Sequence, residues 1–476
     1  MYGEDSMRVM KFGGTSVGTG AAISQTARIL AAAHREGRPM IGVVSAMAGI
    51  TNLLLESASA AASGDAEASA MLSSALLDRH LGAIDEVIGD PGRREVTSTT
   101  IRGLVERCIR LVESVHVLGD LSPRGTDWIV SFGERMSVVI LAGALDELGV
   151  AAEPVNADRI IVTDEVFGSA EPLLDKTRTM AQATLGPLLD RGVLPVVTGF
   201  FGATEDGATT TLGRGGSDYS AAILANALSA DEVWIWTDVD GVMTADPRLV
   251  PGARTLPAVS FAEATELAYF GAKVIHSPTM RPAAECGIPI WIKNTFRPER
   301  PGTRIGPEPT ENGSVKAITA IPGLSVITVE GSGFLSVAGV TARVFSVLGR
   351  AGINVFMISQ ASSQHSLSFV VRGTDGPRVV RLLTTEFEFD LLRERVLQIT
   401  EDPGRAIIAV VGGGMRGTPG VAGRVFQTLG NEGINIAAIA QGSSELNISF
   451  VVAEPEIARA VPVLHQAFKL GDPPAR

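Results

Sequence analysis

Two stretches of the chain, residues 326–371 and 407–452, repeat each other at a constant offset of 81 residues. The matched positions include Gly333 with Gly414 and Asn354 with Asn435. Each copy reads as a strand, a glycine-rich turn, a helix, a Gly-Ile-Asn turn, a strand, a polar turn and a last strand. A unit this small cannot bury its apolar face alone, so the copies must pack on each other or on a second subunit. The repeat therefore predicts tandem α+β domains built from βαββ units.

The residues before the repeat follow another pattern, in which short apolar runs alternate with helical segments. The runs that predict strands are residues 8–11, 39–45, 152–156, 193–198 and 232–236. Strands that are apolar throughout and separated by helices are typical of a parallel sheet covered on both faces. We predict an α/β domain over residues 7–296, a linker over 297–315, and repeat domains over 316–400 and 401–476 that can exchange strands.

Charge and cysteine usage exclude several classes of protein. The net charge is −12 over 476 residues, and no cluster of Lys and Arg marks a nucleic-acid site. Cys108 and Cys286 form no metal or disulfide pattern, which suits a reducing compartment. The N-terminus lacks the apolar core of a signal peptide, and the most apolar stretch, residues 128–148, carries four charged side chains. We therefore expect a soluble, cytoplasmic protein without a membrane partner.

The strongest local signal is a strand that runs into two glycines and a helix, residues 8–17 followed by 21–35. Gly13 and Gly14 allow backbone amides to approach a ligand closely, and the helix that follows adds the positive end of its dipole. Lys11 adds a full positive charge beside the turn. These features predict a phosphate cradle. An ordinary βα turn with a surface lysine is the alternative, and the P-loop consensus is absent.

A second glycine-rich turn, residues 209–220, also runs into a helix. Arg214 offers a planar fork that suits a carboxylate, and Asp218 is placed to orient Lys11. The alternative for Ser217 or Asp218 is a helix cap, which contributes about 1 kcal/mol. Glu134, which the sequence places at the end of a strand over residues 129–131, suits an ammonium ligand. Its alternative is a solvated glutamate at a helix start.

Two further segments point to a nucleotide. The strand 232–236 ends in a polar turn, residues 237–242, and Asp246-Pro247-Arg248 follows. Such a turn can hold adenine and ribose. Lys273 is a second candidate for a phosphate-binding lysine, whereas His276 reads as a packed or capping residue. A GxGxxG string at residues 412–417 does not indicate a dinucleotide site. The next strand ends at Gln441, where a dinucleotide site would carry an acidic residue.

Taken together, these motifs closely resemble aspartate kinase, a member of the amino-acid kinase fold. The strings that carry the resemblance are KFGGTSV, SAMAGITN, SFGE, TTTLGRGGSDYSA, WTDVDGV, DPR and FGAKVIH, in this order. The repeats resemble its two ACT domains, and their strings are most similar to the kinase half of bifunctional aspartokinase–homoserine dehydrogenases. Because the chain ends before a dehydrogenase could begin, it resembles a single-function aspartokinase of that branch or a kinase half standing alone.

The resemblance implies an enzyme that transfers a phosphoryl group from ATP to the side-chain carboxylate of L-aspartate, with Mg²⁺ bound through the phosphates and no metal held by the protein. This step opens the route to lysine, threonine, methionine and isoleucine. The implied roles are catalysis by Lys11 and Asp218, aspartate binding by Thr51, Glu134, Phe200, Arg214 and Ser217, and ATP binding by Lys11, Gly13, Gly14, Thr237, Asp238, Arg248 and Lys273.

The resemblance also implies regulation. Gln360 and Gln441 match positions that contact an amino-acid effector, for which threonine is the first hypothesis and lysine the second. Their alternative is a polar strand end that closes a turn. The first repeat departs from the family at residues 336–339 and at Gln364. A homo-oligomer through the ACT domains is expected. The competing functions are a glutamate- or carbamate-type kinase and a non-catalytic amino-acid sensor.

Overall fold

The computed structural model describes residues 6–271, 276–307, 315–331, 339–360, 366–442 and 444–471. The chain forms two compact units. The first unit contains residues 1–242, 257–261 and 274–308, and the second contains residues 243–256, 262–273 and 309–476. Two segments of the predicted α/β domain, 243–256 and 262–273, thus belong to the second unit.

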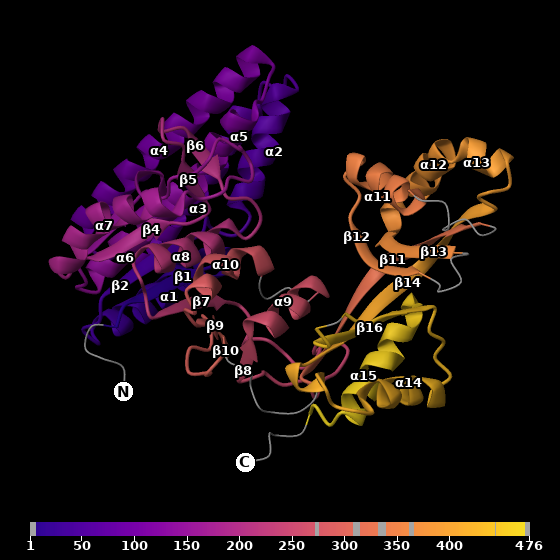
Figure 1. Cartoon of the computed structure of the whole chain (residues 1–476). Coiled ribbons are helices and arrows are strands. Elements are labelled where there is room, and N and C mark those ends of the chain that lie inside the picture. Colours follow the sequence, from indigo (N-terminus) through magenta and orange to yellow (C-terminus); the bar gives the residue numbers. More distant parts are fainter. Residues whose placement is uncertain are drawn as a thin grey trace. The chain divides into compact units, whose positions relative to one another are not determined.

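An eight-stranded sheet, in the order β3-β4-β2-β1-β7-β9-β10-β8, forms the centre of the first unit (Figure 1). All neighbouring strands are parallel except β9 and β10. The strands are β1 (Arg8–Phe12), β2 (Met40–Val44), β3 (Ala152–Val155), β4 (Leu194–Thr198), β7 (Glu232–Thr237), β8 (Ala258–Ser260), β9 (Ile290–Asn294) and β10 (Thr303–Gly306). β10 lies within the span predicted as a linker. β1, β2 and β4 are buried along their whole length, which explains why an apolar run predicted them.

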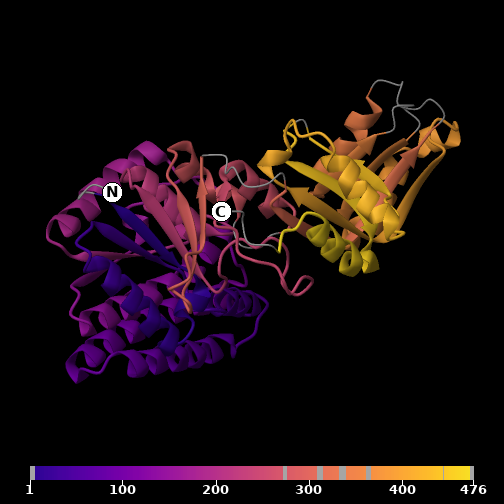
Figure 2. The same cartoon turned by 90° about the horizontal axis from the view of Figure 1, so that it is seen from below.

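Helices cover both faces of this sheet, as Figure 2 shows from below. One layer contains α1 (Gly20–His34) and α6 (Phe132–Glu147), on which α2 (Ile50–Ala62), α3 (Ala68–Val87), α4 (Pro91–Leu118) and α5 (Pro123–Val130) are stacked. The opposite layer contains α7 (Leu174–Asp190), α8 (Gly216–Ala227) and α10 (Ser277–Glu285). A hairpin of β5 (Phe201–Ala203) and β6 (Thr209–Thr211) precedes α8.

The strand predicted over residues 129–131 is wrong. These residues end α5, and Glu134 lies in the first turn of α6. Ser122 caps α5 through its side chain, and Pro123 occupies the first turn, where proline needs no N–H partner. Together, Pro123–Glu147 is long and apolar enough to cross a membrane, but 78% of its most apolar window is buried within the fold. It is therefore weak evidence for a membrane span.

The second unit contains a six-stranded antiparallel sheet in the order β12-β13-β11-β14-β16-β15. Its elements are α9 (Phe261–Tyr269), β11 (Ala317–Glu330), α11 (Val340–Arg350), β12 (Val355–Gln360), β13 (Ser366–Arg372), α12 (Gly376–Glu386), α13 (Glu388–Leu392), β14 (Gln398–Val411), α14 (Val421–Asn431), β15 (Ala438–Ala440), β16 (Asn447–Ala453) and α15 (Ile457–Ala467). Both copies of the repeat thus share one sheet, and each continues into a further helix, α12 or α15.

The two inner strands of this sheet serve both copies of the repeat. The first part of β11, residues 317–321, pairs with residues 407–411 of β14, whereas residues 324–330 pair with β13 and with residues 398–405 of β14. Each copy buries its own core, in which Val344 and Val425 occupy equivalent, fully buried positions. The repeat in the sequence therefore corresponds to a repeat in the packing.

Candidate active site

A cavity of about 360 Å³ opens at the carboxyl ends of the central parallel strands of the first unit. This edge of an open α/β sheet is the usual place for a ligand site. The lining residues come from the turn after β1, the segment after β2, the first turn of α6, the end of β4 and the start of α8. They are Lys11, Gly14, Ser45, Ala46, Met47, Ala48, Gly49, Thr51, Asn52, Glu134, Phe200, Gly213, Arg214, Gly215, Gly216, Ser217 and Asp218.

Lys11 is the buried cation of this cavity. It lies on β1 with only 8% of its surface exposed, and its Nζ is 2.6 Å from Oδ1 of Asp218 in the first turn of α8. An ion pair of this kind fixes the direction of a flexible side chain. The structure thus brings together the two residues that the sequence predicts as catalytic.

The two glycines of the turn after β1, Gly13 and Gly14, have different roles. The amide of Gly13 donates a hydrogen bond to the carbonyl of Trp236, so the chain itself already pairs this donor. Gly14 lines the cavity, and a Cβ atom at this position would lie 3.0 Å from the carbonyl oxygen of Ala46. Glycine at this position therefore permits a close approach of two backbone segments.

The turn before α8 places Arg214 between two glycines with left-handed backbone. Gly213 has φ +74° and Gly215 has φ +72°, a region that side chains disfavour. The side chain of Arg214 is exposed in the cavity wall, and Ser217 and Asp218 follow in the first turn of the helix. The sequence GRGGSD thus presents a cation, a hydroxyl and a helix N-terminus to one space.

Phe200 adopts a backbone conformation that is unusual for a residue with a side chain. Its φ is 76°, and such strain costs on the order of 1–3 kcal/mol. The amide of Phe200 donates a hydrogen bond to Oγ of Ser220 over 3.0 Å. The carbonyl of Phe200 accepts a hydrogen bond from the amide of Leu212 over 2.8 Å. The surrounding structure therefore holds this strained residue in the cavity wall.

Glu134 is a carboxyl group buried beside the cavity, with 2% of its surface exposed. Its Oε1 accepts a hydrogen bond from the amide of Ala46 over 3.0 Å, and its Oε2 has no partner among the described residues. Burial raises the pKa of Glu134 to about 8, although the Ala46 amide opposes this shift. A cationic group of a ligand would satisfy the unpaired oxygen.

The other predicted site residues lie outside this cavity. Thr237 and Asp238 lie at the carboxyl end of β7, next to β1 in the sheet. Arg248 belongs to the second unit, where its exposed guanidinium pairs with Asp246 over 2.6 Å. Lys273 lies outside the described residues, as do residues 336–338 and Gln364. No cluster of metal-binding side chains occurs among the described residues.

The predicted effector residues are exposed. Gln360 ends β12, and Gln441 directly follows β15, so both lie at edges of the second unit's sheet. Their role as effector-binding residues stays a prediction.

The motif at residues 45–52 was recognised from the sequence, but the role of Ala46 within it was not predicted. Its amide binds Glu134, and its carbonyl limits the turn at Gly14. A backbone contact has no side-chain signature, and only the position of this segment after a buried strand could have indicated it.

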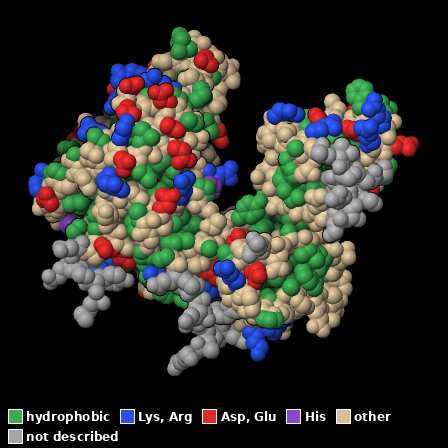
Figure 3. Space-filling view, in the orientation of Figure 1, with side chains coloured by type: hydrophobic (Ala, Val, Ile, Leu, Met, Phe, Trp, Pro, Cys, Tyr) green, Lys and Arg blue, Asp and Glu red, His purple; other side chains and the backbone are tan. Residues whose placement is uncertain are grey.

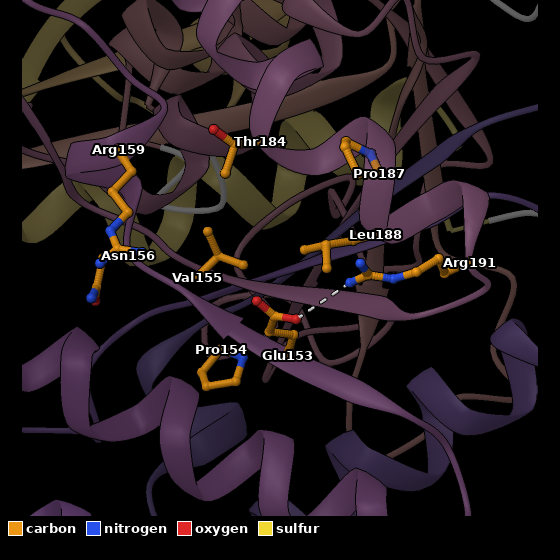
Figure 4. Close-up of a pocket in the computed structure, with 9 residues that line it drawn as sticks. All are labelled: Glu153, Pro154, Val155, Asn156, Arg159, Thr184, Pro187, Leu188 and Arg191. Atoms are coloured by element: carbon orange, nitrogen blue, oxygen red, sulfur yellow. Dashed lines mark ion pairs between the residues drawn. The ribbon is translucent and has the colours of Figure 1, made fainter.

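A second cavity of about 380 Å³ lies between the edge strand β3 and α7 (Figure 4). Glu153 and Arg191 point toward each other there over 3.9 Å, and both are exposed. None of the predicted site residues lines this cavity. On the visible face of the first unit in Figure 3, basic and acidic side chains are interspersed, without a basic field for nucleic acid.

Comparisons with known proteins show the family of the chain. A model of the amino acid kinase family matches residues 6–294, and an ACT domain model matches residues 327–387 and 408–468. The bifunctional aspartokinase/homoserine dehydrogenase of Haemophilus influenzae is 37% identical over 97% of this chain. The chain spans about half the length of such bifunctional relatives, 56% in this case. Aspartokinase 3 of Arabidopsis thaliana is 34% identical, and the match covers 97% of this chain and 81% of the relative.

Solved structures are similar over the whole chain. Escherichia coli aspartokinase III in complex with aspartate and ADP has 32% identity and a TM-score of 0.79, covering 97% of this chain and 100% of that one. The same enzyme in complex with lysine and aspartate has 32% identity and a TM-score of 0.80, covering 98% and 100%. The resemblance and the fold class predicted from the sequence are thus confirmed. The chain belongs to the amino acid kinase family, in its aspartokinase branch, with two ACT domains after the kinase domain.

Proposed function

We propose that this protein transfers the terminal phosphoryl group of ATP to the side-chain carboxylate of L-aspartate and releases 4-phospho-L-aspartate and ADP. The observation that carries this proposal is the charge pattern of one cavity. A buried cation, Lys11, a buried acid, Glu134, and an exposed cation, Arg214, line the same 360 Å³ space. The aspartokinase III structure with aspartate and ADP supports the choice of substrates.

The three ionisable side chains match the three charged groups of aspartate, and the ammonium group of the substrate favours the ionised form of Glu134. The Oε2 atom of Glu134 takes the ammonium group, and the guanidinium of Arg214 takes the α-carboxylate through its planar fork. Thr51, Phe200 and Ser217 complete the walls. The side-chain carboxylate then lies toward Lys11 and the start of α8.

The chemistry requires positive charge more than a base. The attacking carboxylate has a reference pKa of about 3.9, so it is already ionised at neutral pH. The obstacle is the approach of an anion to a polyanion, which positioning and electrostatic stabilisation overcome. Lys11, aligned by Asp218, neutralises charge on the transferring group, and the N-terminus of α8 adds its dipole. Mg²⁺ on the phosphates of ATP supplies the remaining positive charge.

The nucleotide is proposed to lie along the end of β7. Thr237 and Asp238 are next to β1 there, and Gly14 faces the same cavity as Lys11. Arg248 and Lys273 are kept as ATP-binding residues on the motif resemblance alone, and so is Gly13.

Release of ADP, measured with aspartate and with glutamate, tests the proposal. We expect turnover with aspartate that Lys11→Ala abolishes and that Lys176→Ala, which removes an exposed lysine outside the cavity, leaves intact. Turnover with glutamate alone would assign a different amino-acid kinase. Absence of ADP release with both substrates would favour a non-catalytic sensor.

The ACT pair is proposed to bind an end product of the pathway, threonine first and lysine second. The aspartokinase III structure with lysine supports an amino-acid effector in this family. Titration of activity with each amino acid, in the parent protein and in Gln360→Ala and Gln441→Ala variants, distinguishes the two. A flat response to both would remove the sensing role. A homo-oligomer and a cytoplasmic location stay predictions, which light scattering and cell fractionation test.

A further inference from the structure

Asp127 is a buried carboxylate outside the cavity, and its hydrogen-bond partners within the described residues are all uncharged. It lies on α5 with 2% of its surface exposed. Its Oδ2 accepts hydrogen bonds from the amides of Gly168 and Thr211, each over 2.8 Å, and its Oδ1 accepts one from the hydroxyl of Thr211 over 2.8 Å. Burial of a carboxylate is costly, so its donors must be fixed well enough to offset that cost.

The donors belong to the two segments that carry the turn of Arg214. Thr211 ends β6, only three residues before Arg214, and its carbonyl accepts a hydrogen bond from the amide of Ala170 over 2.9 Å. Gly168 belongs to the neighbouring loop. A Cβ atom on Gly213 would lie 3.3 Å from the carbonyl oxygen of Gly168, so this loop supports the turn directly. Figure 1 shows α5 beside the hairpin of β5 and β6, which ends at Thr211.

Arg214 itself has no side-chain hydrogen bond or ion pair within the described parts of the chain. Its position therefore depends on the backbone between Thr211 and the start of α8. Asp127 holds one end of that backbone, and the hydrogen bond from the amide of Gly216 to the carbonyl of Gly213 closes the other over 3.0 Å.

We propose that Asp127 is a positioning residue for substrate binding, which aims the guanidinium of Arg214 at the α-carboxylate by fixing Thr211 and Gly168. This inference rests on the proposed function, because it needs Arg214 to bind the carboxylate. The role is geometric and does not use the charge of Asp127.

Steady-state kinetics of Asp127→Ala and Thr211→Val test the proposal. Thr211→Val keeps the shape of the side chain and removes one hydrogen bond, so it serves if Asp127→Ala fails to fold. We expect each to raise the KM for aspartate, about tenfold or more for Asp127→Ala, with the KM for ATP unchanged. Asp127→Asn should recover most of the affinity, because its Oδ1 can accept both amides while its amide group donates to the Thr211 hydroxyl.

A double-mutant cycle with Arg214→Ala separates positioning from general loss of structure. If Asp127 acts through Arg214, then Asp127→Ala or Thr211→Val in the Arg214→Ala background raises the KM for aspartate no further. Additive effects, or equal rises in the two KM values, would overturn the inference. If Arg214→Ala alone leaves the KM for aspartate unchanged, the failure lies in the proposed role of Arg214 and not in Asp127.

Discussion

Replacing Glu134 by glutamine keeps the size of the side chain and removes its ability to ionise. In the parent protein, burial raises the pKa of this carboxyl group from 4.5 to about 8. The folded state therefore binds the proton more tightly than the unfolded state does. Its contribution to stability is complete below about pH 4.5 and is lost as the pH rises toward about 8.

The size of this effect follows from linkage. Between the two pKa values, unfolding releases close to one proton, so the parent loses about 1.4 kcal/mol of unfolding free energy per pH unit relative to Glu134→Gln. From about pH 5.5 to about pH 7.5 the difference is roughly 3 kcal/mol. Bound aspartate brings an ammonium group to Oε2, favours the ionised form and reduces this dependence.

Urea denaturation of both proteins over this pH range measures the difference directly. Glu153→Gln, which changes an exposed carboxylate on the edge strand β3, controls for the loss of a negative charge. We expect the free energies of the parent and Glu134→Gln to diverge with pH, and those of the parent and Glu153→Gln to run parallel. Parallel curves for Glu134→Gln would refute a carboxyl group held neutral by burial.

Three further substitutions test other parts of the structure. Asp218→Asn removes the charge that aligns Lys11, and kcat for ADP release should fall on the order of 100-fold while the melting temperature stays near that of the parent. Gly215→Ala puts a Cβ atom at φ +72° and 3.0 Å from Thr279, which should cost about 1–3 kcal/mol in urea denaturation; an unchanged midpoint would contradict the strain. Lys316→Ala removes the buried ammonium group that pairs with Glu263 over 2.7 Å in the second unit, and it should cost about 3–5 kcal/mol in urea denaturation. Lys316→Met with Glu263→Leu should recover part of this loss, because no buried carboxylate then lacks its cation, although the amide of Gly413 loses its acceptor.

The sequence predicted five of the parallel strands, of which β1, β2 and β4 are buried along their whole length, but it did not predict β8 and β9. Residues of β2, β4 and β7 are mostly apolar, and this pattern is typical of a strand buried in a parallel sheet. The segment 129–131 was predicted as a strand on the same ground, but it ends the helix α5. Length and the Ser-Pro start at residues 122–123 were the signals that distinguish the two, since so short an apolar run fits either structure.

The charged side chains that line the cavity were predictable from the sequence, whereas the backbone contacts that support it were not. Lys11, Glu134, Arg214 and Asp218 line one space, as their motifs indicated. The amide of Ala46 and the support that Asp127 gives to the turn depend on contacts between distant segments. Local sequence contains no record of such contacts, nor of the membership of Arg248 in the second unit.

The two long strands of the ACT pair determine how a chimaera of this protein must be designed. A transplant of residues 316–400 as a block would carry residues 317–321, which complete the sheet of the other half, and would leave behind residues 401–405, which belong to the half being moved. The grafted half and the remaining half would each then meet a foreign strand at their centre. Specificity for an effector is therefore better exchanged by substitutions at the sheet edges, β12 and β15, than by exchange of whole domains.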